Sequence, residues 1–361
     1  MKTLLLFLLL VGPLAYSQNL KPELWRKPWK ASWITYAENA NNVYSLLGLK
    51  DYGVFKFQKT VSLPEKPAKC LIHVSGDNRY KLYVNGTWVS AGPGRGDLYF
   101  WNFETLDIAP YLKAGENTVE ALVWNEGKGK PEAQISYATG FILQADEEAF
   151  DVFNTSVRWE VAKNLGVSPL AVRVPGYYVA GAGEMQDYTK AWSPFISAKS
   201  LGPGLTKGAS IDAKGWMLYP SAIPAMELKE QRFAAIRKGE GDLIHGKSLV
   251  VPANSSADLW IDQGVLTNAY PQLTFTGGKD AKIGLTYAEG LYEKKPLSTT
   301  TKNGNHKGNR NDIEDKYWLG RKDSLIADGA THTFETMTYR TFRYVRLTVK
   351  TESDALTLQD F

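Results

Sequence analysis

Short runs of alternating apolar and polar residues, each closed by a turn signal, dominate this sequence. The chain contains 32 glycines and 17 prolines, and these residues separate the runs from one another. Such runs are typical of strands, because successive side chains point to opposite faces of a sheet. We therefore predict an all-β fold built from β-sandwiches. The predicted strands are residues 54–61, 68–75, 80–84, 118–124, 136–144, 157–161, 248–251, 258–262, 272–276, 281–287 and 342–350.

The stretch SGDNRYKLYVNG, residues 75–86, predicts a strand together with its turn. Its second half alternates, and Asn85-Gly86 is a pair that readily adopts the positive φ of a two-residue turn. We predict a hairpin here. The acidic-amide pair Asp77-Asn78, directly before the strand, makes the same stretch a candidate sugar site.

Two consecutive sandwich domains, both jelly-roll-like, are predicted from the order of these runs. Residues 164–221 are rich in Gly, Pro, Ser and Lys and show little periodicity, so we interpret them as a loose tail of the first domain plus a connection. Only residues 226–238 have a helical pattern, which predicts one short helix between the domains. The predicted domains are residues 18–215 and 216–361, both of ordinary size.

The first 17 residues predict a signal peptide for export. Lys2 precedes the apolar run 4–10, and small residues follow it up to Ser17. The run is too short to anchor the chain in a bilayer, and no second apolar run of membrane length follows. We therefore expect a secreted or periplasmic protein that begins near Gln18 and has no membrane span.

Charge and cysteine content exclude several classes of protein. The formal net charge of +4 is spread along the chain, so we expect no nucleic-acid partner. The single cysteine, Cys70, lies in the apolar stretch CLIHV and has no intrachain partner, so core packing rather than disulfides must stabilise the fold. The four histidines lack the spacing of metal ligands.

Several short segments also stand in a distinctive order. They are Trp29 with Trp33, FKFQKTVSL from Phe55, DNRYKLYVNG from Asp77, GPGRGD from Gly92, DIAPYLKAGENTVEALVWN from Asp107, WIDQG from Trp260, YAEGLY from Tyr287, KGNRNDIED from Lys307 and RTFRYVRLTV from Arg340. This ordered set covers nearly the whole chain after the signal peptide. It resembles the bacterial α-L-rhamnosidases of glycoside hydrolase family 78.

The resemblance implies a modular enzyme that releases terminal L-rhamnose from plant or algal glycans with inversion. A jelly-roll module comes first, a concanavalin-like β-sandwich second, and an (α/α)6 barrel carries the catalytic carboxylates. No sequence for this barrel follows Phe361, so we assign no catalytic residue and leave open whether this chain alone is an enzyme. The acidic residues show no spacing typical of a glycosidase pair; they include Glu184, Asp187, Glu227, Glu289, Asp312, Glu314 and Asp315.

The resemblance further implies a calcium-dependent rhamnose site in the first module. There, an adjacent Asp and Asn hold the ion with a downstream Asn, and a tryptophan lines the sugar pocket. The corresponding positions are Asp77, Asn78, Asn125 and Trp101, with the backbone carbonyl of Pro131 as a further ligand. Ca²⁺ prefers such oxygen ligands, and an exposed indole offers a flat apolar surface to a deoxy sugar.

The residues also allow a structural interpretation, in which Asp77-Asn78 bond their own backbone and Trp101 lies in the core. We expect this chain to bind a rhamnose-containing glycan or to scaffold the catalytic (α/α)6 domain. Two alternatives stay open. One is a stand-alone, calcium-dependent, lectin-like module, and the other is a purely structural pair of docking domains.

Overall fold

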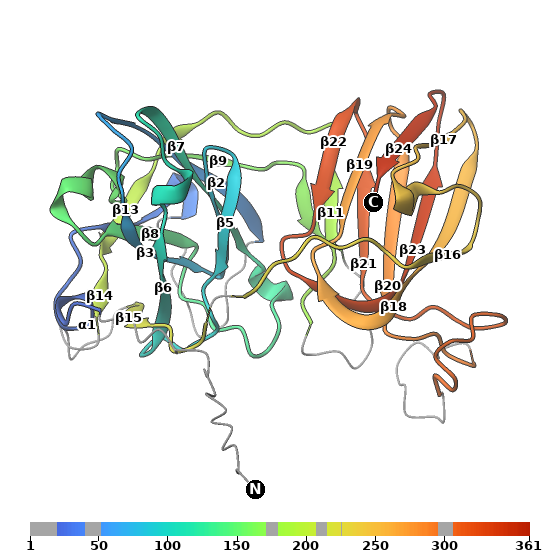
Figure 1. Ribbon diagram of the computed structural model, residues 1–361, viewed down its shortest axis with the longest axis horizontal. Coiled ribbons are helices and arrows are strands. Elements are labelled where there is room, and N and C mark those ends of the chain that lie inside the picture. Colours follow the sequence, from blue (N-terminus) through green and yellow to red (C-terminus); the bar gives the residue numbers. More distant parts are fainter. Residues whose placement is uncertain (1–19, 40–51, 171–179, 207–214, 225, 295–305) are drawn as a thin grey trace, which may run out of the picture.

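The computed structural model describes residues 20–39, 52–170, 180–206, 215–224, 226–294 and 306–361. Two β-sandwiches lie next to each other along the long axis of the molecule, one mostly blue to green and the other mostly orange to red (Figure 1). The predicted all-β fold is confirmed. The predicted signal peptide, residues 1–17, lies outside the described residues.

The first sandwich consists of a seven-stranded and a six-stranded sheet. In spatial order, the larger sheet contains β13 (Lys199–Pro203), β1 (Ser32–Thr35), β8 (Gly140–Ala145), β3 (Leu71–Asp77), β6 (Trp101–Asp107), β15 (Met217–Pro220) and β14 (Leu205–Thr206). The smaller sheet contains β12 (Ile196–Ser197), β9 (Glu160–Lys163), β2 (Gly53–Leu63), β7 (Gly115–Asn125), β4 (Arg79–Val84) and β5 (Thr87–Gly92).

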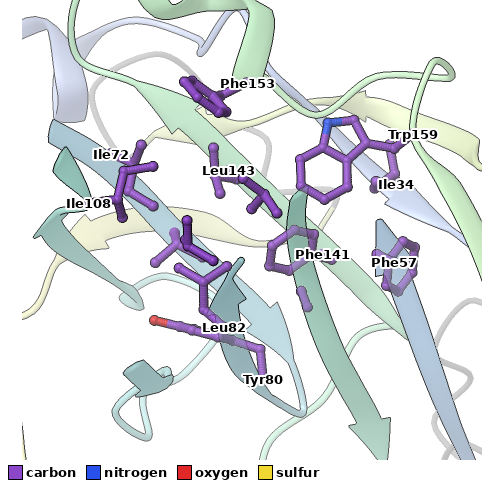
Figure 2. Close-up of a cluster of buried hydrophobic side chains, with 14 of the residues drawn as sticks. Ile34, Phe57, Ile72, Tyr80, Leu82, Ile108, Phe141, Leu143, Phe153 and Trp159 are labelled. Atoms are coloured by element: carbon purple, nitrogen blue, oxygen red, sulfur yellow. The ribbon is translucent and has the colours of Figure 1, made fainter. Parts of the chain in front are cut away.

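The main core of the first sandwich lies between these two sheets. Figure 2 shows Phe141 of β8 among Phe57, Tyr80 and Trp159. The ring centroid of Phe141 lies 5.7 Å from those of Phe57 and Trp159 and 6.2 Å from that of Tyr80. Cys70 is buried in the same core as a free thiol, so packing stabilises this domain without a cross-link.

A second apolar cluster covers the outer face of the seven-stranded sheet. The N-terminal segment, including the one-turn helix α1 (Glu23–Arg26), packs there. The cluster contains the partly buried Trp25 and four buried tryptophans, Trp29, Trp33, Trp101 and Trp216. Trp33 stacks on Trp216 with a centroid distance of 4.0 Å, and Trp101 meets Trp216 edge to face at 6.4 Å. Much of the tryptophan content therefore serves core packing.

The second sandwich packs a seven-stranded sheet against a four-stranded one. The first contains, in spatial order, β10 (Val167–Pro169), β11 (Glu184–Asp187), β21 (Lys322–Ile326), β20 (Lys282–Ala288), β23 (Arg340–Lys350), β18 (Ser256–Ala269) and β16 (Ala235–Lys238). The other contains β17 (Leu249–Val251), β24 (Leu356–Asp360), β19 (Gln272–Gly277) and β22 (Gly329–Glu335). Short 3₁₀ turns complete the fold at Ala37–Asn39, Ala109–Tyr111, Gly127–Gly129, Glu148–Phe153 and Leu243–His245.

Two local predictions are confirmed at the level of backbone geometry. Asn85 and Gly86 adopt φ values of 51° and 77° and turn the chain from β4 into β5. The alternating sequence RTFRYVRLTV forms most of β23, which lies between β20 and β18 and buries Phe342, Leu347 and Val349 in the core.

The interpretation of residues 164–221 as a loose tail and connection was wrong. β10 and β11 join the second sandwich, whereas β12, β13 and β14 return to the first. β15, which follows the predicted domain boundary at residue 216, also belongs to the first sandwich and pairs in parallel with β6. The chain therefore crosses between the sandwiches more than once.

The helix predicted at residues 226–238 is absent; residues 226–234 form no regular secondary structure, and residues 235–238 form β16. β16 pairs with β18, which satisfies its backbone hydrogen bonds at the sheet edge. Phe233 packs its ring 4.7 Å from that of Phe361, and Gly239 ends the strand at a φ of 95°. Tertiary packing thus overrides a weak helical pattern. None of the helices within the described ranges has the length and apolar character to cross a membrane.

Candidate functional site

The carboxylate of Asp77 lies at the end of β3 and is completely buried. Its Oδ1 accepts hydrogen bonds from Asn78 Nδ2 at 2.8 Å and Ser136 Oγ at 2.6 Å. Its Oδ2 accepts from Trp216 Nε1 at 2.8 Å and from the backbone N–H of Tyr137 at 2.7 Å. Burial raises the pKa of this carboxyl, and these hydrogen bonds oppose that shift. Asp77 therefore connects distant segments of the first sandwich.

The other predicted ligands lie close by and are also engaged. Asn78 Oδ1 accepts the backbone N–H of Glu126 at 2.8 Å, and Asn125 Oδ1 accepts that of Gly127 at 2.9 Å. The carbonyl oxygen of Pro131 accepts a backbone N–H at 3.0 Å. Asp77, Asn78 and Asn125 thus form one buried network through Ser136.

The carboxylate of Asp77 has no lone pair left for a calcium ion, because each of its oxygens already accepts at least two hydrogen bonds. A calcium site needs oxygens whose lone pairs face the ion. Here N–H and O–H donors already point at the four proposed ligands, Asp77, Asn78, Asn125 and Pro131.

Trp101 is not the exposed sugar platform that the resemblance implies. Only 2% of its surface is exposed, and its Nε1 donates to Ser75 Oγ at 3.1 Å. Its ring belongs to the tryptophan cluster on the outer face of the seven-stranded sheet. The structural interpretation of Trp101 is therefore correct.

A cleft of about 610 Å³ opens between the two sandwiches, adjacent to the buried network. Arg79 follows Asn78 in the chain, Glu126 follows Asn125, and both line this cleft together with Pro131. Its volume lies within the usual range for ligand sites, and the junction of two domains is a frequent location for them. The charged or aromatic lining residues are Arg79, Arg95, Glu104, Glu126, Tyr287, Glu289, Lys307, Arg321, Tyr339 and Arg340.

Glu104 of β6 lines the cleft on the side of the first sandwich, and both of its carboxylate oxygens accept hydrogen bonds. Its Oε1 accepts the backbone N–H of Gly94 at 2.8 Å, and its Oε2 accepts the hydroxyl of Tyr80 at 2.9 Å. Burial raises the pKa of Glu104 to about 7, and these two hydrogen bonds partly oppose the shift. Glu104 therefore changes protonation near neutral pH.

Glu126 faces Arg321 across the cleft. The closest approach between the carboxylate and the guanidinium is 3.8 Å, which is an ion pair without a direct hydrogen bond. Burial raises the pKa of Glu126, and Arg321 opposes that shift. This pair leaves hydrogen-bonding capacity on both partners for a ligand.

The second-sandwich wall is held rigid by Arg340. Its guanidinium is buried and donates to Glu184 Oε1 at 2.7 Å and to both oxygens of Asp323 at 2.8 and 2.9 Å. Its Nη1 also donates to the carbonyl oxygen of Thr338 at 2.9 Å. Glu184, one of the acidic residues considered from the sequence, is therefore a structural ion-pair partner. Such a preorganised wall suits a binding site.

Cationic and apolar groups complete the cleft. Arg79 donates to the carbonyl oxygen of Pro93 at 2.9 Å, and the exposed Arg95 makes no ion pair with any described residue. At the edge of the cleft, Ile223, Met226 and Tyr339 are 66%, 48% and 44% exposed. Charged donors, carboxylate acceptors and apolar surface thus converge on one space. This combination can bind a ligand that is rich in hydroxyl groups and has apolar faces.

Glu104 and Glu126 of the cleft share the direction of their pKa shifts. Glycoside hydrolysis commonly uses one carboxyl group that holds its proton and a second that stays ionised. The pKa values of Glu104 and Glu126 are both shifted upwards by burial. These two shifts therefore assign the ionised role to neither residue.

The sequence prediction missed the cleft residues by one position. The motif DNR contains Arg79, and the motif WNEG contains Glu126. The sequence prediction names the preceding amides, Asn78 and Asn125, instead. The sequence does contain a signal for Arg79 and Glu126, because successive side chains of a strand point to opposite faces of the sheet, so the charged neighbour of a buried amide is expected on the other face. Arg321 and Tyr339 carry no such local signal.

Comparison with known proteins identifies solved structures that share this fold. A scan against protein-family models found no match, and neither did a search of curated protein sequences. Solved structures do match. The chain is similar over 92% of its length to the GH78 family rhamnosidase of Bacillus sp. GL1, with 13% identity and a TM-score of 0.71.

Two further rhamnosidase structures show the same fold with lower TM-scores. The α-L-rhamnosidase from Dictyoglumus thermophilum matches 91% of the chain at 18% identity with a TM-score of 0.55. That from Aspergillus terreus matches 92% at 13% identity with a TM-score of 0.52. This chain spans 55% of the Bacillus structure and 35% and 37% of the other two.

Proposed function

We propose that this chain is the β-sandwich part of an α-L-rhamnosidase-like glycoside hydrolase that acts on terminal L-rhamnose of plant or algal glycans. In this proposal the chain binds the glycan in the cleft between its sandwiches and presents it to a catalytic (α/α)6 domain. One observation carries the proposal: a single superposition on the Bacillus rhamnosidase covers 92% of this chain, including both sandwiches that form the cleft.

The cleft chemistry suits such a ligand. Hydroxyl groups of a sugar both donate and accept, so they can engage the carboxylate of Glu126 and the guanidinium groups of Arg79 and Arg321. The methyl group of a deoxy sugar would pack on the apolar surface of Ile223, and a ring face would cover Tyr339. The predicted export fits this role, because plant and algal polysaccharides are met outside the cell.

Calorimetric titration of the mature chain with L-rhamnose, and with a rhamnose-containing oligosaccharide, tests the proposal. We expect binding that Arg79→Ala and Tyr339→Ala each weaken by about tenfold, since a hydrogen bond to a charged group or an aromatic contact contributes about 1.5 kcal/mol. The control is Arg26→Ala, because Arg26 is equally basic but exposed in α1, away from the cleft. Unchanged affinity in both cleft variants would refute the assignment.

Two further arms of the same titration separate the alternatives. Binding should be equal in calcium and in a chelator, because the predicted calcium ligands are already engaged. Calcium-dependent binding would instead favour the lectin-like module. An aryl rhamnoside should not be hydrolysed by this chain, and turnover would place the catalytic groups within it.

A docking role is the second candidate, and a cluster of exposed aromatic and aliphatic side chains favours it. Tyr99 and Ile223 are 60% and 66% exposed, and the rings of Phe100 and Tyr219 meet edge to face at 5.5 Å. Exposed apolar clusters commonly mark contact surfaces. If this cluster docks another domain, the isolated chain should self-associate in sedimentation experiments, and Ile223→Ser should reduce that association. A monodisperse chain would count against docking.

A further inference from the structure

A second cavity of about 400 Å³ lies between the sandwiches and shares no lining residue with the cleft described above. We propose that this second cavity binds a neutral saccharide residue, with the indole of Trp192 as its platform. Its walls come from β4, from the crossing segment that contains β11, and from β22 with the residues that follow it. Its volume lies in the lower part of the range for small-molecule sites.

Trp192 provides an aromatic surface that is held in place but left accessible. Its side chain is 36% exposed, and its backbone forms an antiparallel bridge with Asn164. Next to it, the N–H of Ser193 donates to the carbonyl oxygen of Lys163 at 2.8 Å, and the Ser193 hydroxyl accepts from Lys163 N at 2.9 Å. The ammonium group of Lys56 lies 5.4 Å from the centroid of the indole ring. A ring fixed in this way loses little entropy when a sugar stacks on it.

Four hydrogen-bonding groups of the lining have no partner among the described residues. They are the hydroxyls of Tyr83 and Tyr188, the amide nitrogen of Gln186 and the indole nitrogen of Trp192. A hydrogen bond from Asn164 Nδ2 to Gln186 Oε1 at 3.3 Å orients the side-chain amide of Gln186. Tyr188 is oriented by its ring, which stacks on His332 at 4.0 Å.

These groups are the ones that recognise an uncharged, hydroxylated ligand. Burial raises the pKa of Tyr83 and of Tyr188 above the ordinary phenol value, so both keep a neutral O–H that can donate and accept. A sugar hydroxyl can bond to each of them while its ring lies on the Trp192 indole. Aromatic surface with a few oriented polar groups is the usual composition of such sites.

The charges around this cavity cancel, which selects against ionic ligands. Lys81 pairs with Glu335, Glu184 with Arg340, and Lys190 with Asp187. The ring of His332 faces the carboxylate of Asp328 at 2.8 Å. Each Lys and Glu side chain of the lining therefore has an oppositely charged partner. An acidic sugar would find no free cation here, in contrast to Arg95 beside the first cleft.

Saturation-transfer NMR and calorimetry on the mature chain test this inference with three probes: methyl α-L-rhamnopyranoside, methyl β-D-galactopyranoside and sodium D-galacturonate. We expect at least one neutral glycoside to bind, and galacturonate to bind no better than either. Trp192→Ala should weaken the neutral glycoside by about tenfold, because the stacking surface is lost. Tyr83→Phe removes only a hydroxyl and should weaken it by about threefold.

Phe195→Ala is the matched control, because Phe195 is 40% exposed in the same segment but does not line the cavity. Thermal melts establish whether each variant is folded. If Trp192→Ala does not fold, Tyr83→Phe still tests the inference. Wild-type affinity in both Trp192→Ala and Tyr83→Phe would overturn the inference, as would absence of binding to both neutral probes. Trp192→Ala should weaken the neutral glycoside to the same extent in the wild type and in the Tyr339→Ala variant of the first cleft, so the two sites succeed or fail separately.

Discussion

Lys81 of β4 reaches from the first sandwich into the second and donates a hydrogen bond to the carbonyl oxygen of Thr336 at 2.8 Å. It also pairs with the carboxylate of Glu335, and its side chain is only 1% exposed. Its Nζ lies 4.7 Å from the ring centroid of Trp88 and 4.5 Å from that of Tyr270. Burial lowers the pKa of this lysine, and Glu335 opposes that shift. One buried cation therefore links the sandwiches between the two cavities.

Replacing this cation should destabilise the protein. Lys81→Met leaves Glu335 without its partner in a largely buried position, so we expect the free energy of unfolding to fall by about 3 kcal/mol. Urea unfolding monitored by circular dichroism measures it. The control is Lys190→Met, since Lys190 is 61% exposed and its pair with Asp187 should contribute less than about 1 kcal/mol. Equal losses in both variants would mean that Lys81 does not hold the sandwiches together.

Asp77→Asn tests the buried network directly. The amide that it introduces has an NH2 group in place of one oxygen. That group faces either Asn78 Nδ2 and Ser136 Oγ, which donate to Oδ1, or Tyr137 N and Trp216 Nε1, which donate to Oδ2, so we expect a loss of about 2 kcal/mol. Differential scanning calorimetry gives the change. The wild-type melting temperature should be the same in calcium and in a chelator. A calcium-induced rise in the wild type that disappears in Asp77→Asn would show that these residues bind the ion after all.

Sequence alone predicted the three 11-residue strands but missed others, including the seven-residue β6 and β22 and the two-residue β12 and β14. β2, β7 and β23 each run for 11 residues with one face in a core, so their alternation is visible in the sequence. β12 and β14 have two residues each and exist only because a distant strand offers hydrogen bonds. No local pattern encodes such a pairing.

The candidate site was predictable only as a neighbourhood. Asp77, Asn78 and Asn125 do come together, but sequence cannot show that neighbouring N–H and O–H groups already donate to their oxygens. The cleft needs Arg79 and Arg321 on opposite walls, 242 positions apart in the chain by subtraction of their numbers. Their proximity depends on how the two sandwiches pack against each other, and the hydrophobic periodicity of the sequence does not predict that packing.

His73 should stay neutral in the folded protein well below the ordinary range of histidine. It is completely buried, its Nδ1 lies 2.9 Å from Thr105 Oγ1, and its Nε2 lies 3.2 Å from Asp146 Oδ1. Burial lowers its pKa from 6.5 to about 4, although Asp146 opposes that shift. NMR titration of the ring protons, assigned with His73→Gln, should give this midpoint.

The same shift makes stability depend on pH. Between pH 6.5 and about 4, the unfolded chain binds a proton at His73 that the folded chain does not bind. Its contribution to stability is therefore present above pH 6.5 and is lost as the pH falls through this window. An NMR midpoint near 6.5 would contradict this account of the site.

Glu104 should shift stability in the opposite direction. Burial raises its pKa from 4.5 to about 7, so within this window the folded protein holds a proton that the unfolded chain has released. The free energy of unfolding should therefore fall as the pH rises from 4.5 to about 7. Glu104→Gln keeps the side-chain shape and removes the titration. Measured by urea unfolding, the variant should gain stability relative to the wild type as the pH rises through this window.

The matched control for Glu104→Gln is Glu160→Gln, since Glu160 is exposed on β9 and away from the cleft. Its unfolding free energy should follow the wild-type pH dependence. If Glu104→Gln also follows the wild type, Glu104 is not the group that holds a proton in the cleft. If it departs as expected, sugar affinity in the first cleft should change over the same window, because a ligand hydroxyl bonded to Glu104 would meet an acid below about pH 7 and a carboxylate above it.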